Sequence, residues 1–215
     1  MTDRDGTAVI VFAKAARPGA VKTRLITLLG EEGAAALHVK LVRRTLDTLR
    51  AASFKGAQLY CTPGTDDPFF WFCSGHYGVT LHEQAAGDLG ERMRVALENA
   101  LVNHATALLV GTDCPALTAR HLRQAERALR EGDDAVFVPC EDGGYALVGL
   151  TRADATLFDG IAWGGDQVMS DTRARLQQLG WRWRELETLW DVDRPEDYDR
   201  LVHSGLLDGR RQQLT

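Results

Sequence analysis

A group of four basic side chains with no acid among them is the most informative chemical feature of the sequence. No Asp or Glu occurs between Gly6 and Gly30, although the chain of 215 residues has a formal net charge of -5. Lys offers phosphate oxygens a point charge, Arg offers them two parallel donors, and Gly allows the backbone to approach closely. The segment is therefore a candidate polyphosphate site, whose ligands would be Lys14, Arg17, Gly19, Lys22 and Arg24.

The residues before this segment predict where it lies. Residues 7–13 form an apolar run that is typical of a buried parallel strand, so the cations follow the carboxyl end of that strand. Ligands of open α/β sheets bind at that end. A Walker P-loop is excluded, because Val21 rather than Gly precedes Lys22. The alternative is a cationic loop that is merely solvated.

Three aspartates are candidates for holding a divalent cation. Asp113 follows the apolar run 107–111, while Asp191 and Asp193 precede a helix that is expected to begin at Pro195. In an extended segment, residues i and i+2 share a face, so the last two carboxylates can converge on one ion. Mg²⁺ (or Mn²⁺) suits one or two carboxylates together with phosphate oxygens. The alternatives are that Asp113 stabilises a turn and that Asp193 caps the helix.

Two further acidic residues could act on a second substrate, the acceptor of a transferred group. Glu141 and Asp142 stand beside a flexible Gly pair, where either could bind an acceptor hydroxyl or remove its proton. A simple turn between two strands is the alternative. The residues assigned to the acceptor side are Gly143, Gly144, Tyr145 and Trp163.

The composition narrows the class of protein. Hydrophobic residues make up 45% and charged residues 26%, as in ordinary soluble globular proteins. The acidic balance argues against nucleic acid as a partner, and no stretch approaches a membrane span. Four cysteines without a C-x-x-C pair favour reduced thiols and a cytoplasmic location. The six histidines show no metal-site spacing, and most are expected at the surface. The oligomeric state stays open.

Strand-like and helix-like patterns alternate along the chain, which predicts an α/β fold. We expect a single domain over residues 1–206 and a flexible polar tail over residues 207–215. Strands are expected near 7–13, 58–61, 79–82, 107–111, 134–138, 145–150 and 181–184, with a hairpin turn at 141–144. Helices are expected from residue 37 to before residue 55, after Asp67, after Asp88 in a capping box with Glu91, after Thr118, over 167–179 and from Pro195.

Five motifs in this order resemble those of the GT-A superfamily of nucleotide-diphospho-sugar transferases. They are FAKAARPGAVKTRL at 12–25, GDLGERM at 87–93, GTDCP at 111–115, EDGGY at 141–145 and DVDRPED at 191–197. The nearest resemblance is to a bacterial family of predicted glycosyltransferases, some of them linked to arsenosugar biosynthesis. It extends from the first strand to the last helix.

The resemblance implies a Rossmann-like GT-A fold with three α/β/α layers and a mostly parallel central sheet. It implies that the first loop wraps the donor's phosphates and that Asp113 with Asp193 holds the divalent ion. It also implies that the segment 87–92 borders the nucleoside. The candidate residues of that segment are Gly87, Asp88, Gly90 and Arg92.

The leading hypothesis is a Mg²⁺-dependent transferase that passes a sugar from a nucleoside diphosphate to a small acceptor. The ion and the basic loop would neutralise charge on the departing diphosphate, with Lys22 and Asp113 as catalytic residues. One alternative is nucleotidylyl transfer from an NTP to a phosphorylated small molecule with release of pyrophosphate, as in the similar molybdopterin and phospholactate guanylyltransferases. Another is a non-catalytic nucleotide-binding regulator.

Overall fold

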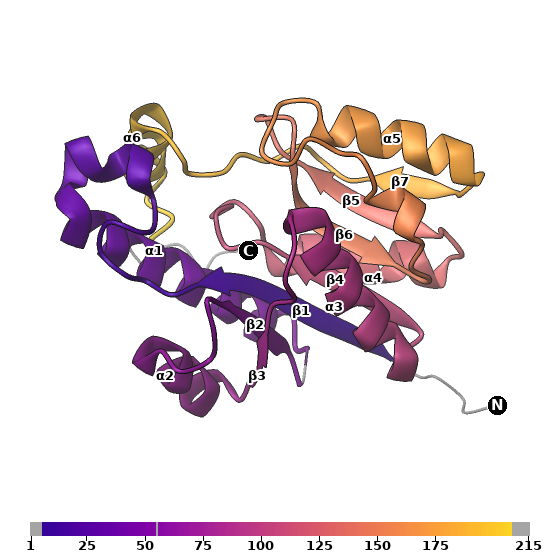
Figure 1. Ribbon diagram of the computed structural model, residues 1–215, viewed down its shortest axis with the longest axis horizontal. Helices are drawn as coiled ribbons and strands as arrows, with labels where there is room; N and C mark the ends of the chain where they lie inside the picture. The colour runs from indigo at the N-terminus through magenta and orange to yellow at the C-terminus, as the bar shows by residue number, and fades with distance from the viewer. Residues whose placement is uncertain (1–5, 55, 208–215) are drawn as a thin grey trace.

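A sheet of seven strands forms the centre of the molecule (Figure 1). The computed structural model describes residues 6–54 and 56–207. The strand order is β3-β2-β1-β4-β6-β5-β7. The strands are β1 (Thr7–Lys14), β2 (Gln58–Thr62), β3 (Thr80–Glu83), β4 (Thr106–Val110), β5 (Ala135–Pro139), β6 (Tyr145–Leu150) and β7 (Trp183–Glu185).

Most neighbouring strands are parallel, as predicted. β1 pairs in parallel with β2 and β4, β2 with β3, and β5 with β7. β6 runs antiparallel to both of its neighbours, β4 and β5. The predicted hairpin turn joins β5 to β6, where the Cys140 amide donates to the Gly144 carbonyl at 2.9 Å. Gly143 has a φ of 89°, a conformation that glycine adopts without strain.

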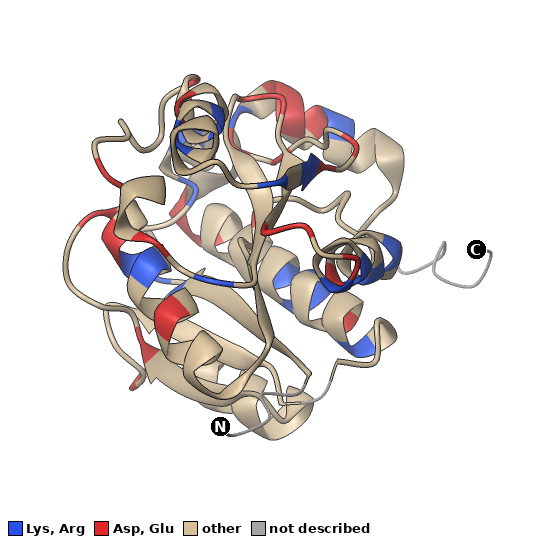
Figure 2. Ribbon diagram, turned by 90° about the vertical axis from the view of Figure 1, so that its right-hand side faces the viewer, with Lys and Arg blue, Asp and Glu red and all other residues tan. Residues whose placement is uncertain are grey.

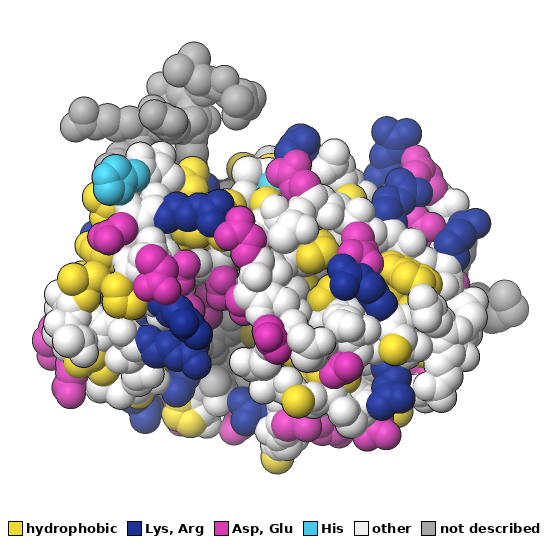
Figure 3. Space-filling view, turned by 90° about the horizontal axis from the view of Figure 1, so that it is seen from above, with side chains coloured by type: hydrophobic (Ala, Val, Ile, Leu, Met, Phe, Trp, Pro, Cys, Tyr) yellow, Lys and Arg dark blue, Asp and Glu magenta, His cyan; other side chains and the backbone are white. Residues whose placement is uncertain are grey.

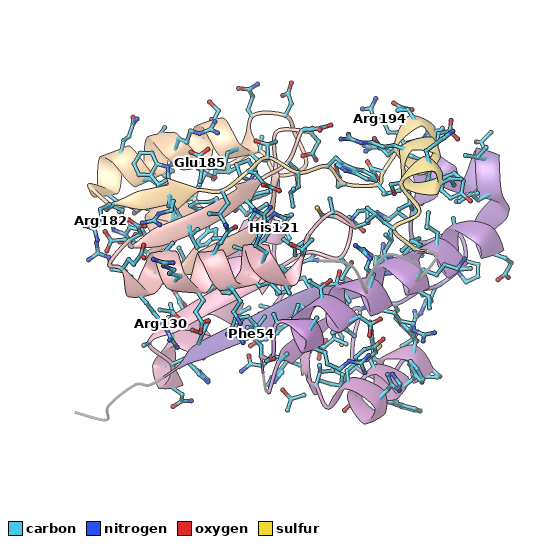
Figure 4. All side chains as sticks on the ribbon, turned by 180° about the vertical axis from the view of Figure 1, so that it is seen from behind. Phe54, His121, Arg130, Arg182, Glu185 and Arg194 are labelled. Carbon is cyan, nitrogen blue, oxygen red and sulfur yellow. The ribbon has the colours of Figure 1, made fainter. Side chains whose placement is uncertain are left out.

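Helices cover both faces of the sheet, which confirms the three-layer architecture (Figure 1). One face packs against α1 (Ile26–Ala51), α2 (Pro68–Tyr77) and α4 (Ala119–Arg130). Figure 4 shows α4 from behind, with His121 near its start. The other face packs against α3 (Leu89–Asn103), the short helix η2 (Ala155–Leu157) and α5 (Val168–Leu179).

The first strand explains how the two cores form. Val9, Val11 and Ala13 of β1 belong to one core, whereas Ile10 and its neighbours Ala8 and Phe12 belong to the other. Successive side chains of a strand point to opposite faces of the sheet, so each face of β1 must be apolar. The continuous apolar run that predicted a buried strand follows from this double burial.

A third, smaller core fixes the segment just before the last helix, α6 (Pro195–Ser204). Trp190, Val192 and Leu201 pack there against Leu25 of the short helix η1 (Thr23–Leu25) and against Leu37 and Leu41 of α1. Figure 1 shows α6 beside the first turns of α1. The residues 190–193 are thereby held against the loop that follows β1.

Two helices differ from their predictions. α1 begins at Ile26 rather than near residue 37, and Gly30, with φ 70° and ψ 169°, interrupts it. Asp88 caps α3 by accepting from the Glu91 amide at 2.9 Å, but the Glu91 carboxylate pairs with Arg94 instead of completing a capping box. The strong apolar spacing starts only after the kink at Gly30, which is why the first turns of α1 were missed.

The aromatic residues of α2 divide between core and solvent. Phe70 is fully buried against the sheet and Phe69 packs at the edge of that core. Trp71 and Phe72, however, are 57% and 45% exposed. A helix turns about 100° per residue, so four consecutive aromatic residues cannot all face one sheet.

Several other predictions concern the surface and the ends of the chain. His38 and His121 are buried, whereas the other four histidines are exposed or partly exposed, which agrees with the expectation that most lie at the surface. All four cysteines are buried and free, and the cytoplasmic location remains a prediction.

Beyond Leu207 the predicted tail lies outside the described residues, and the boundary of the single domain stays a prediction. Over the described part of the chain, no helix has the length and apolar character to cross a bilayer. Figure 2 shows basic and acidic residues interspersed along the ribbon.

Candidate active site

A cavity of about 520 Å³ opens where β1, β2 and β4 end. In Figure 3 the molecule is seen from above, and acidic and basic side chains lie beside a hollow in this face. The cavity is lined by residues from the first loop, from the turn after β4, from the β5–β6 hairpin and from the segment before α6. Its charged lining residues are Lys14, Arg24, Asp113, Asp142, Asp191 and Asp193.

Lys22 joins three of these segments. Its backbone is left-handed, with φ 48° and ψ 42°, and only 4% of its side chain is exposed. The ammonium Nζ lies 2.6 Å from Oδ1 of Asp113 and donates to the carbonyl of Val192 at 2.6 Å. The Val192 amide in turn donates to the Asp113 carbonyl at 2.8 Å. Lys22 therefore meets protein oxygen atoms and is not among the residues that line the cavity.

The other cations of the first loop divide into two groups. Arg24 lines the cavity and forms an ion pair with Asp193. Lys14 also lines it and donates to the Ala20 carbonyl at 2.8 Å. Arg17 lies outside the lining, 3.8 Å from Asp67. Gly19, also outside it, has a φ of 76° and adjoins the Glu31 carboxylate.

The three predicted metal ligands share this cavity. Asp191 and Asp193 line it on either side of the fully buried Val192, in agreement with the i, i+2 argument, and Asp113 lines it from the turn after β4. Burial, together with the carboxylates of Asp142 and Asp113, raises the pKa of Asp191 to about 6.

This set of oxygen donors fits a hard divalent cation. Asp113 and Asp193 are nevertheless already paired with Lys22 and Arg24. Within residues 6–54 and 56–207 no three His, Cys, Asp or Glu side chains form a cluster that could hold a metal ion. Binding of a cation would therefore require these side chains to rearrange.

The two candidate bases have different surroundings. Asp142 lines the cavity, and its Oδ1 accepts from the Gly144 amide at 2.9 Å. Glu141 lies outside the lining, and its two oxygens accept from Arg200 at 2.7 and 3.1 Å. That hydrogen bonding lowers the pKa of Glu141. Of the two acids, Asp142 is the one that lines the cavity.

An aromatic wall closes another side of the cavity. Trp163 stands edge-on to Tyr145, with ring centroids 6.5 Å apart, and both line the cavity. Burial raises the pKa of Tyr145. A Cβ on Gly90 would lie 2.4 Å from Nε1 of Trp163, so the indole packs directly on the first turn of α3. A Cβ on Gly143 would similarly meet the Asp166 carbonyl at 2.0 Å.

The segment 87–92 contributes less to the lining than the resemblance implies. Leu89 lines the cavity, but Gly87, Asp88, Gly90 and Arg92 do not. Asp88 caps α3, and Nε of Arg92 donates to the Gly87 carbonyl at 2.9 Å. Their observed contacts thus serve the start of the helix, and a nucleoside-binding role remains a prediction.

Sequence reasoning missed several lining residues. His38 Nε2 lies 2.8 Å from the Lys14 carbonyl, whereas its buried Nδ1 has no partner. Burial lowers the pKa of His38. Its position on the apolar stripe of α1, between Leu37 and Leu41, is the sequence signal for this burial. Gln84 is fixed by a bond from Nε2 to the Tyr60 carbonyl at 3.0 Å. The other missed lining residues include Phe12, Thr62, Cys114 and Cys140.

Solved structures similar to this chain include transferases of nucleotides and nucleotide sugars. A protein from Desulfovibrio desulfuricans G20, provisionally named a nucleotide-diphospho-sugar transferase, has a TM-score of 0.84 and 29% identity over 94% of this chain and 88% of its own. A Methanothermobacter nucleotidyl transferase has a TM-score of 0.64 and 17% identity, covering 94% and 98%. A Mycobacterium tuberculosis H37Rv protein in complex with manganese has a TM-score of 0.50 and 19% identity, covering 93% and 99%.

The similarity to the last two structures establishes the fold alone. None of the curated proteins compared with the chain matches it. The sequence profile of one family, described as an uncharacterized protein conserved in bacteria (DUF2064), matches residues 45–165. The matched region contains the Asp113 turn, the β5–β6 hairpin and Trp163.

Proposed function

This chain belongs to the DUF2064 family, and on that premise we propose that it is a divalent-cation-dependent transferase that passes a sugar from a nucleoside diphosphate to a small acceptor. The fold similarity to a protein named as a nucleotide-diphospho-sugar transferase supports the use of a nucleotide donor. The observation that carries the proposal is the cavity, in which two cations and four carboxylates meet beside an aromatic wall.

The cations of the cavity suit the donor's diphosphate. Lys14 and Arg24 both line the cavity, and their charges would stabilise the diphosphate as it departs. Lys22 contributes indirectly, because it holds the turn that presents Asp113. Asp113, Asp191 and Asp193 would hold Mg²⁺ or Mn²⁺, which when bound supplies further positive charge to the leaving group.

The acceptor would lie between Asp142 and the aromatic wall. Its hydroxyl oxygen would form a bond to the anomeric carbon of the sugar while the bond from that carbon to the diphosphate oxygen breaks. The proton of the hydroxyl would pass to the Asp142 carboxylate. Tyr145 and Trp163 would exclude water from this side, and the packing of Trp163 on Gly90 fixes the wall in place.

A thermal-shift screen tests donor binding. The purified protein is heated with ADP-, CDP-, GDP- and UDP-sugars and with the matching triphosphates, each with and without Mn²⁺. A ligand that binds only the folded state raises the melting temperature according to its affinity. We expect stabilisation by one sugar nucleotide in the presence of Mn²⁺. A Lys14→Met variant should lose it, whereas Lys40→Met, at an exposed position of α1, should keep it.

Nucleotidylyl transfer is the second candidate, because the fold is also that of a nucleotidyl transferase. In that reaction a phosphorylated acceptor attacks the α-phosphorus of an NTP and pyrophosphate departs. The released product separates the two reactions: a nucleoside diphosphate indicates sugar transfer, and pyrophosphate indicates nucleotidylyl transfer. Tight nucleotide binding without turnover would favour a regulator instead.

A further inference from the structure

We propose that Arg24 makes the binding of the divalent cation depend on the donor's phosphates, an inference that rests on the proposed function. Its guanidinium pairs with Asp193, one of the candidate metal ligands. A phosphate group that attracts Arg24 would release the Asp193 carboxylate for the cation. Arg24 is thus assigned a positioning role that acts through Asp193.

The two ion pairs of the site differ in how readily the cation can leave its carboxylate for another partner. The Lys22 side chain is 4% exposed, and its ammonium contacts two protein oxygens, one of Asp113 and one of Val192. Moving the ammonium away would break both contacts of a buried charge, which is costly. The Arg24 side chain is 62% exposed, and that of Asp193 is 39% exposed. Both of these residues line the cavity that would receive the donor. The Arg24–Asp193 pair is therefore the exchangeable one.

The backbone that carries Asp193 is held in place by its neighbours. Val192 is fully buried in the third core, and the Asp193 amide donates to Oδ2 of Asp197 at 3.1 Å. Asp193 would therefore keep its place when Arg24 moves. Arg24 can move its charged group by side-chain rotation alone, without a change in η1.

Electrostatics favours this exchange when phosphate is present. The guanidinium fork matches carboxylate and phosphate groups alike, and a diphosphate offers more charge than one carboxylate. Without phosphate, the positive charge of Arg24 beside Asp193 opposes a divalent cation. With phosphate, the cation gains both the freed carboxylate and phosphate oxygens. Nucleotide and cation should therefore raise each other's affinity by the same factor.

The test measures Mn²⁺ binding to the full chain without nucleotide, by electron paramagnetic resonance of the free ion. Arg24→Met should bind Mn²⁺ about two- to fivefold more tightly than the unaltered protein. The reason is that the cation no longer competes with Arg24 for the Asp193 carboxylate, and an exposed ion pair has about this strength. Arg24→Lys, which keeps the charge, should restore the weaker binding. The matched control is Arg50→Met, since Arg50 pairs with Asp47 on α1 with side-chain exposures of 61% and 33%, away from the cavity.

The second measurement is the dissociation constant of ADP, CDP, GDP and UDP by calorimetry, with EDTA or with saturating Mn²⁺. Mn²⁺ should tighten binding of the preferred diphosphate at least about fivefold in the unaltered protein. In Arg24→Met that factor should fall. If Arg24→Met and the unaltered protein bind Mn²⁺ equally tightly without nucleotide, the role proposed for Arg24 is wrong, and the proposed function is not affected. If no nucleotide binds the unaltered protein, the proposed function fails as well.

Discussion

The ammonium of Lys22 lies 2.6 Å from the Asp113 carboxylate, and this contact links the loop after β1 to the turn after β4. The same ammonium donates to the Val192 carbonyl, so it also fixes the segment that precedes α6. Three parts of the chain that are distant in sequence thus meet at one buried positive charge. The loop that the sequence predicts to be a polyphosphate site therefore also connects the segments that form the cavity.

Replacing Lys22 by Met should lower the free energy of unfolding by about 1–3 kcal/mol, because a buried charged hydrogen-bond donor is lost while the volume of the side chain changes little. Urea denaturation followed by circular dichroism measures the change. Lys40→Met, at an exposed position of the same half of the chain, should stay within about 0.5 kcal/mol of the unaltered protein. Equal stability of the two variants would contradict the structural role of Lys22.

Asp142→Asn should lower kcat about 100-fold or more, since a positioned base commonly contributes at least this factor. The assay uses the donor identified by the thermal-shift screen and follows release of the nucleoside diphosphate. Glu141→Gln should lose far less activity, because Glu141 lies outside the cavity and faces Arg200. The reverse ranking of the two variants would transfer the role of base to Glu141.

Gly90→Ala should destabilise the protein by about 1–3 kcal/mol, as expected for an overpacked site, because the new methyl group would overlap the Trp163 indole. The matched control is Gly75→Ala in α2, where a Cβ meets nothing within 4 Å. A double-mutant cycle with Trp163→Ala supplies the decisive comparison. The cost of Gly90→Ala should largely vanish when the indole is absent, and additive costs would contradict direct packing.

His38 should make the stability of the protein depend on pH. Burial lowers its pKa in the folded state, opposed by the bond to the Lys14 carbonyl and by Asp113, while the charges of Lys14 and Lys22 lower it further. The unfolded chain therefore takes up the proton at a higher pH than the folded protein. The free energy of unfolding should fall as the pH drops below about 6.5, by at most about 1.4 kcal/mol per pH unit, until the folded-state pKa is passed.

Urea denaturation at pH 7, 6 and 5 measures this dependence. His38→Gln retains a donor for the Lys14 carbonyl but does not titrate, so its stability should fall less between pH 7 and pH 5. The difference between the two pH profiles isolates the contribution of His38 from that of the carboxylates. Identical profiles would show that His38 is not held neutral by the fold.

The parts of the fold with strong local signals were predictable from the sequence. Residues 8–13 are apolar without interruption because β1 is covered on both faces, and the Gly pair after Asp142 marked the β5–β6 hairpin. The convergence of Asp191 and Asp193 on one cavity followed from the period of an extended segment. Each of these predictions depended on neighbours in sequence.

The predictions that failed or stayed incomplete depended on contacts between distant residues. The sequence identified Lys22 as a cation, but its burial depends on Asp113 and Val192, which only the fold brings to it. Likewise, Glu141 and Asp142 are adjacent in sequence, and Arg200 on α6 distinguishes their surroundings. His38 was missed because a single histidine on an apolar helix face has no spacing that reveals its partner.

The reversed direction of β6 gives the molecule two unequal ends. Because β6 starts where β4 and β5 finish, the hairpin at 141–144 joins the strand termini around the cavity. Of the described residues, those that begin β1, β2 and β4 contribute nothing to the cavity lining. Insertions or fused tags at that opposite rim should therefore leave ligand binding intact, which makes it the practical place for labels or surface immobilisation.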